Sequence, residues 1–225
     1  MLIVFSGLDG AGKSTQITHL IEYLSEKGCA TQYFWSRGGY TPLFSHMKDW
    51  SRKLTRGRAL PVSGHNSERT KAFSRSRTRK SWLIIAILDL ILVYGFYLRL
   101  LQSLGKIVVC DRYLWDTLID FRLNFPEEHV ETWFLWRVLV KITPVPDVAF
   151  LLLIPVEESG RRSKLKYEPF PDTPEVLAKR LAMYRQLAQA GYWHEMNGLG
   201  PMNELIQEIQ QEVNMQFIKN RQTAT

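Results

Sequence analysis

Near the start of the chain, a run of eight residues has the types and spacing needed to hold the phosphates of a nucleotide. It reads Gly7-Leu8-Asp9-Gly10-Ala11-Gly12-Lys13-Ser14. Glycines allow the backbone to curl around a phosphate with its N–H groups pointing inward. In such a loop Lys13 reaches the β- and γ-phosphates, and the Ser14 hydroxyl ligates Mg²⁺. The run therefore predicts a P-loop that binds ATP and Mg²⁺, with Thr15 adjoining it.

The elements around this run are those that a P-loop requires. Residues 2–5 are an apolar strand pattern directly before it, and residues 14–27 are a helical pattern directly after it. The positive N-terminal end of that helix would face the same phosphates. Further strands are expected at 31–35, 107–110, 148–154 and 192–196, and further helices at 42–54, 82–104, 114–124, 130–142, 174–190 and 201–217. This alternation predicts an α/β fold with a parallel sheet and helices on both faces.

Asp111 and Arg112 follow the apolar strand at 107–110. They are therefore expected at the carboxyl edge of the sheet, where ligands of open α/β folds bind. A carboxylate there suits the Mg²⁺–water site of a P-loop, and a guanidinium suits bidentate binding of a phosphate. The sequence thus predicts Asp111 and Ser14 as the metal residues, and Arg112 as a phosphate ligand.

More cations follow two other predicted strands. Arg37 precedes two glycines after the strand at 31–35, and Arg161, Arg162 and Lys164 follow the strand at 148–154. Arginines that close over a transferring phosphoryl group stabilise its charge in the transition state. We therefore expect Arg161 and Arg162 to contact the nucleotide. The alternative for Arg162 and Lys164 is an ordinary exposed position.

The composition is that of a globular chain with an anionic partner. The 225 residues carry a net charge of +7 and a pI near 9.4, and fit one domain over 1–225. Two cysteines without a CxxC pair indicate neither a zinc site nor a disulfide scaffold, and no secretory leader is evident, so a cytoplasmic location is expected.

Residues 67–104 combine basic and apolar stretches. We expect a buried helix at 82–98, since Asp89 interrupts it, and contact with a membrane surface through 69–98 stays open.

Taken together, these residues resemble the thymidylate kinase family of P-loop nucleoside monophosphate kinases, nearly from end to end. The resemblance runs through residues 5–16, 37–43, 105–113, 146–147, 161–162, 167–168 and Tyr184. It implies a three-layer α/β/α sandwich with a five-stranded parallel sheet in the order 2-3-1-4-5, and a lid at about 157–172. It further implies that Asp9 positions the phosphoryl acceptor, that Arg37 and Arg112 bind the acceptor's phosphate beside Tyr113, and that the lid closes over ATP. A homodimer is also possible.

One region departs from the family pattern, and that region selects the acceptor. The family has a Phe that stacks on thymine and an Arg that bonds the base, where this chain has Ala86 and Leu90. Asp89 matches the family's acidic position, whereas Asp116 stands where a small hydroxyl residue is expected. We therefore expect Asp89 and Asp116 to bind the acceptor. Asp120 could bind it too, or could face solvent.

The sequence accordingly predicts a kinase that moves the γ-phosphoryl of MgATP to a phosphorylated acceptor, most simply a nucleoside monophosphate such as dTMP. Lys13, Asp9, Arg112 and Arg161 are the expected catalytic residues. Three alternatives remain open at this point. They are a related kinase acting on a sugar, polyol or other small molecule, a P-loop ATPase that acts with nucleic acid, and a silent nucleotide-binding protein at a membrane surface.

Overall fold

The computed structural model describes residues 1–35, 75–166 and 172–223. The chain groups into two units. The first consists of Met1–Trp35, Leu100–Asp116 and Val145–Thr225, and the second of Ser36–Arg99 and Thr117–Pro144. The expectation of a single domain over 1–225 stays a prediction.

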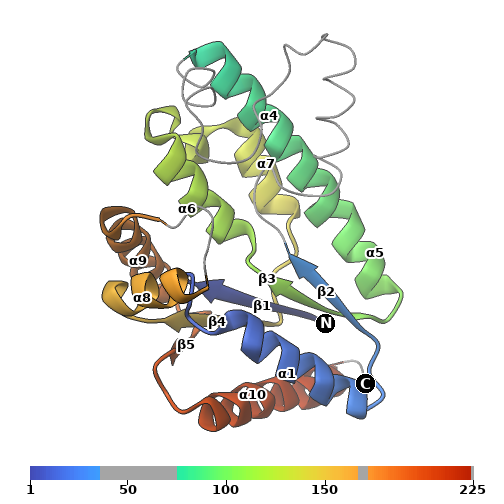
Figure 1. Ribbon diagram of the computed structural model, residues 1–225. Coiled ribbons are helices and arrows are strands. Elements are labelled where there is room, and N and C mark those ends of the chain that lie inside the picture. The colour runs from blue at the N-terminus through green and yellow to red at the C-terminus, as the bar shows by residue number, and fades with distance from the viewer. Residues whose placement is uncertain (36–74, 167–171, 224–225) are drawn as a thin grey trace. The chain divides into compact units, whose positions relative to one another are not determined.

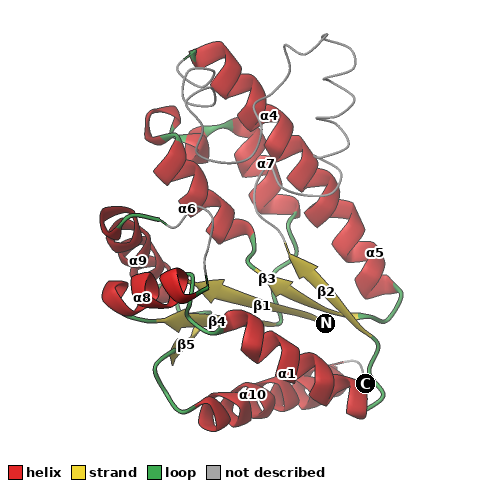
Figure 2. Cartoon of the chain, viewed as in Figure 1, coloured by secondary structure: helices red, strands yellow, loops and turns green. Residues whose placement is uncertain are grey.

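Five parallel strands form the centre of the first unit (Figures 1 and 2). They are β1 Leu2–Gly7, β2 Thr31–Trp35, β3 Ile107–Asp111, β4 Val148–Leu153 and β5 His194–Asn197. Their order is β2-β3-β1-β4-β5, as predicted. β1 lies between β3 and β4, so Phe5 pairs with Asp111 on one side and with Phe150 on the other. Both β1 and β3 are buried along their whole length, which explains the apolar runs at residues 2–5 and 107–110.

The sheet of the first unit is flanked by helices, which confirms the predicted P-loop α/β fold. α1 (Lys13–Glu26) packs beside α10 (Met202–Thr223), and these two helices contact the strands from the same side in Figure 1. α9 (Pro174–Ala188) packs on β4 and on α8 (Val156–Leu165). The predicted lid segment after β4 therefore begins as a helix, which the sequence patterns did not predict.

The second unit is built on a long helix. α4 (Ser76–Leu92) continues through a π-helical turn, Val93–Tyr97, into α5 (Leu98–Ser103), whose residues from Leu100 onward are grouped with the first unit. It packs on α7 (Phe134–Ile142), and its Trp82 contacts two phenylalanines, one of them on α6 (Leu114–Asn124).

Two predicted boundaries in this unit were wrong. The helix expected at 82–104 begins six residues earlier, where Arg79 bonds Glu127 and Glu128 at 3.2 and 2.8 Å and so anchors its first turn. The helix expected at 130–142 starts at Phe134, because a separate 3₁₀ turn takes up Val130–Thr132.

Among the described residues, the helical stretch Ser76–Ser103 is long and apolar enough to cross a membrane by length and composition alone. Buried core helices meet the same criterion. Leu83, Ala86, Ile87 and Leu90 of this stretch are fully buried, whereas Leu92 and Phe96 are exposed. Contact with a membrane therefore stays a prediction.

Candidate active site

The predicted P-loop connects β1 to α1, and close neighbours leave no room for side chains at two of its glycines, Gly7 and Gly10. Gly7 has a φ of 134°, and a Cβ there would lie 2.1 Å from the backbone oxygen of Leu152 on β4. At Gly10, a Cβ would lie 2.9 Å from the Cβ of Arg162. Packing against β4 and α8 thus excludes side chains here, in addition to the predicted need to admit a phosphate.

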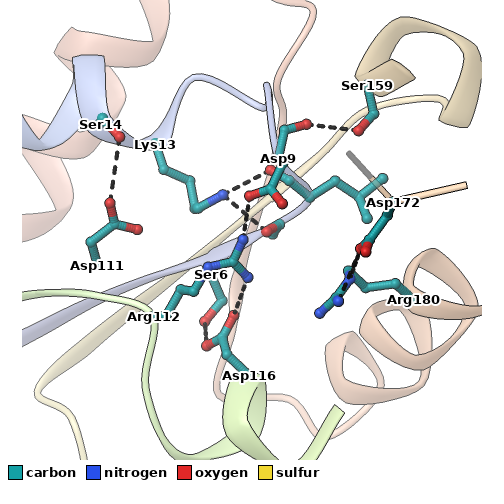
Figure 3. Close-up of polar contacts among 12 residues, drawn as sticks. Ser6, Asp9, Lys13, Ser14, Asp111, Arg112, Asp116, Ser159, Asp172 and Arg180 are labelled. Carbon is teal, nitrogen blue, oxygen red and sulfur yellow. Dashed lines mark hydrogen bonds and ion pairs between the residues drawn. The ribbon is translucent and has the colours of Figure 1, made fainter. Parts of the chain in front are cut away.

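Lys13 lies inside this loop (Figure 3). Its Nζ donates hydrogen bonds to the backbone oxygens of Gly7 and Leu8, at 3.0 and 2.7 Å. Burial lowers the pKa of Lys13 to about 8, and nearby Arg112 adds to the shift, while three aspartates oppose it. The ammonium is thus held where phosphates are expected, at some cost in desolvation.

The two predicted metal residues lie together. The Ser14 hydroxyl donates to Oδ2 of Asp111 at 3.4 Å, and Tyr33 on β2 donates to the same oxygen at 3.4 Å. Desolvation and the Asp111 carboxylate raise the pKa of Tyr33 to about 12. The described residues contain no group of three His, Cys, Asp or Glu side chains that could hold a metal by themselves. A hydroxyl and one carboxylate still suit Mg²⁺, which commonly takes its other ligands from water and substrate phosphates.

Arg112 is the most constrained residue of the site. Its φ of 72° lies in the left-handed region, which is unfavourable for a side chain. Its N–H donates to the backbone oxygen of Phe5 at 2.8 Å, and its side chain is buried. The guanidinium bonds Asp9 of the P-loop and lies 3.7 Å from a carboxylate oxygen of Asp116 (Figure 3). Such strain persists only where many contacts maintain it, as they do at functional sites.

Asp116, at the start of α6, is enclosed by protein donors. Its Oδ2 accepts from the Ser6 hydroxyl at 2.5 Å and from the Tyr113 N–H at 2.9 Å, and its Oδ1 accepts from the Tyr184 hydroxyl at 2.6 Å. Sequence reasoning missed Ser6 as a site residue and gave Tyr184 no role. Ser6 sits beside the P-loop motif, which was the available signal. Tyr184 comes from α9, far along the chain, and only the family resemblance pointed to it.

Helix α8 of the predicted lid contacts the P-loop directly. The Ser159 hydroxyl donates to the backbone oxygen of Asp9 at 2.7 Å, and Arg162 donates to that of Gly10 at 2.9 Å. Arg161 is instead largely exposed, and both of its bonds, at 2.7 and 2.8 Å, go to Glu158. Hydrogen bonds from Arg161 and then Arg162 lower the pKa of Glu158 to about 2.

Several predicted site residues belong to the second unit or lie outside the described residues. Arg37, Tyr167 and Glu168 lie outside the described residues. Asp89 belongs to the second unit, as do the family-divergent Ala86 and Leu90, and all three side chains are buried within α4. Asp120, for which a solvent-facing position was the alternative, is 5% exposed and therefore buried.

Two ends of the P-loop cluster therefore carry different chemistry. At the N-terminal end of α1, Lys13 and the backbone amides suit a phosphate chain, with Ser14 and Asp111 beside it as oxygen ligands. Arg112 lies next to Asp9, where a second anionic group would find a buried guanidinium. The arrangement can bring two phosphate-bearing molecules together.

Comparison with known proteins points to one family. No protein-family model matches the chain. The chain is 34% identical to the thymidylate kinase of Desulfotalea psychrophila over 164 residues, which cover 72% of this chain and 67% of the relative. It is 28% identical to a probable thymidylate kinase of Pyrococcus horikoshii, over 83% of this chain and 82% of the relative. A thymidylate kinase of Prochlorococcus marinus aligns at 24% identity over 97% of this chain and 98% of its own length.

Proposed function

Because the chain belongs to the thymidylate kinase family, we propose that it is a nucleotide kinase that transfers the γ-phosphoryl group of ATP to dTMP. The single structural observation that supports this most is the buried Arg112, which bonds the P-loop carboxylate Asp9. A guanidinium at this point gives an acceptor that already carries a phosphate a binding partner next to the ATP phosphates.

Each residue of the cluster has a proposed role in the transfer. An oxygen of the acceptor's phosphate attacks the γ-phosphorus, and the bond to the β–γ bridging oxygen breaks, so that ADP leaves. Lys13 and the loop amides neutralise charge on the donor side, while Arg112 does so on the acceptor side. Asp9 orients the acceptor, and Arg162 with Arg161 covers the nucleotide.

Mg²⁺ fits beside Ser14 and Asp111, where it would neutralise phosphate charge and orient the β- and γ-phosphates. Tyr33 adds to this site by holding the Asp111 carboxylate in place. Its hydroxyl stays protonated at neutral pH, since its pKa is raised to about 12.

The alternative functions are not favoured. The relatives that match over most of this chain are thymidylate kinases. A kinase for an unphosphorylated sugar or an ATPase would not need a second phosphate-binding guanidinium such as Arg112 beside Asp9. A cytoplasmic location, a homodimer and contact with a membrane surface remain predictions from the sequence.

An acceptor screen tests the proposal. Radiolabelled γ-phosphoryl transfer is measured with dTMP, other nucleoside monophosphates, thymidine, and a phosphorylated and an unphosphorylated sugar. We expect the highest kcat/KM with dTMP and little transfer to thymidine, because thymidine lacks the phosphate that Arg112 binds. Preferred transfer to an unphosphorylated acceptor would contradict the proposal, and release of free phosphate alone would indicate an ATPase.

A further inference from the structure

Arg112 has two kinds of partner, and they differ in how firmly they are held. The Asp9 side chain, which belongs to the P-loop, is 30% exposed, whereas that of Asp116 is 1% exposed. Tyr184, whose hydroxyl accepts from Nη1 of Arg112 at 3.2 Å, is fully buried. One partner can therefore exchange with a ligand, while the other two belong to the packed interior.

Both oxygens of the buried Asp116 carboxylate already accept hydrogen bonds from protein donors. Ser6 and the Tyr113 N–H occupy Oδ2, and Tyr184 occupies Oδ1 next to Arg112. A buried carboxylate needs such donors, because an unpaired charge strongly destabilises a protein interior. These contacts thus explain how the Asp116 carboxylate is stabilised in the interior without an acceptor molecule.

Tyr184 connects the carboxylate to the guanidinium. Its hydroxyl donates to Asp116 and accepts from Arg112, which fixes the direction of both hydrogen bonds. Burial, assisted by the Asp116 carboxylate, raises the pKa of Tyr184 well above its usual value, so the hydroxyl stays protonated over the working range. Ser6 completes the set by fixing the other carboxylate oxygen.

We propose that Asp116 and Tyr184 are positioning residues that brace the Arg112 guanidinium for the acceptor's phosphate, and that neither contacts the acceptor. The inference rests on the proposed function, in which Arg112 binds that phosphate. It replaces the expectation that Asp116 binds the acceptor. The brace also explains how the chain can keep Arg112 in its strained backbone conformation, since two buried groups, Asp116 and Tyr184, hold its side chain.

Kinetics of Tyr184→Phe test the brace, because the substitution removes one hydroxyl and leaves every charge in place. We expect kcat/KM for dTMP to fall about tenfold, the usual effect of losing a hydrogen bond to a charged group, and the KM for ATP to change less than about twofold. Tyr23→Phe is the matched control. It removes a hydroxyl that accepts from Asn214 at 2.7 Å, and its kinetics should match those of the wild type.

Thymidine, used as a competitive inhibitor, separates a brace from direct contact. It lacks the phosphate, so its inhibition constant should be the same in the wild type, Tyr184→Phe and Asp116→Asn. An inhibition constant that rises in Asp116→Asn as much as the KM for dTMP would show that Asp116 touches the nucleoside, and would overturn the inference.

Nitrogen NMR of the Arg112 guanidinium gives a readout that needs no acceptor. In the ligand-free protein, rotation of this group should be slow in the wild type and in Tyr23→Phe, and faster in Tyr184→Phe. Equal rotation rates and equal kinetics in Tyr184→Phe and the wild type would overturn the inference alone. Absence of transfer to dTMP by the wild type would instead overturn the proposed function, and the rotation rates would still decide whether the brace exists.

Discussion

At the scale of single residues, two buried cations are stabilised by different means. Lys13 is held by two backbone oxygens, and Arg112 by Asp9, Asp116 and Tyr184. Carbonyl oxygens compensate the desolvation of an ammonium only in part, which is why the pKa of Lys13 falls. The multivalent phosphates of a nucleotide would compensate it more fully.

Lys13 makes nucleotide binding dependent on pH. Its pKa is about 8 in the ligand-free fold, against 10.5 for an ordinary lysine, so the free site loses this proton as the pH rises above about 8. Phosphates favour the charged form, so ATP binding should take up a proton in this range. We expect the Kd for ATP to rise up to about tenfold per pH unit above about 8. Calorimetry in buffers of different ionisation enthalpy measures the uptake.

The lowered pKa of Lys13 also affects the stability of the fold. ATP affinity falls as the pH rises, whereas the free energy of unfolding gains from this residue. Between about pH 8 and 10.5 the folded, ligand-free chain binds fewer protons at Lys13 than the unfolded chain, so this residue's contribution to the free energy of unfolding rises with pH. In Lys13→Met this contribution is absent.

The same variant is the control for the predicted proton uptake on ATP binding. An uptake that is equal in Lys13→Met and the wild type would show that another group is responsible.

Arg112→Lys tests the role of a planar guanidinium. Lysine keeps the charge but cannot bond two partners in a fixed fork, so we expect the KM for dTMP to rise at least about tenfold. The KM for ATP should change little. Arg185→Lys, an exposed position on α9, is the control, and an equal effect on both substrates in Arg112→Lys would place the residue elsewhere in the reaction.

At the scale of elements, strands could be predicted better than helix ends. β1 and β3 are buried on both faces, so each contains an apolar run, at residues 2–5 and 107–110, that is easily identified. The start of α4 could not be found in the same way, because its first turn is polar and is anchored by Arg79 to glutamates about fifty residues away. Helix α8 was missed because its sequence is mostly polar.

Gly7→Ala should disrupt the junction between β1 and the P-loop. The new Cβ would lie 2.1 Å from the Leu152 oxygen, and β4 is a central strand that cannot move away easily. We expect a loss of more than about 2 kcal/mol in the free energy of unfolding, measured by denaturant titration.

Gly28→Ala is the matched control for this test. Gly28 also has a positive φ, of 72°, but a Cβ there meets nothing within 4 Å. Its loss should be about 1 kcal/mol, the cost of backbone strain alone. Equal losses in the two variants would contradict the packing explanation for Gly7.

Arg162→Ala tests whether α8 supports the P-loop. Arg162 donates to the Gly10 oxygen, so its removal should loosen the loop and raise the KM for ATP about threefold to tenfold. Lys179→Ala, an exposed position on α9, should leave this KM unchanged. A wild-type KM in Arg162→Ala would mean that its contact with Gly10 does not matter for nucleotide binding.

At the scale of the whole molecule, the site is assembled from segments that are distant in the sequence. Arg112 lies 103 positions from Asp9, and Tyr184 lies 68 positions from Asp116. The P-loop could be predicted because its residues are contiguous. The enclosure of Asp116 could not, since it depends on α9 reaching the start of α6. The basic net charge, +7, agrees with two anionic substrates but does not identify them.

The most direct test of the central claim is the initial rate of dTDP formation from ATP and dTMP in the presence of Mg²⁺. The wild type should form dTDP and ADP in equal amounts, and Lys13→Ala should lose at least about a hundredfold of this rate while keeping its fold by circular dichroism. Formation of ADP and free phosphate without dTDP, or an undiminished rate in Lys13→Ala, would contradict the account.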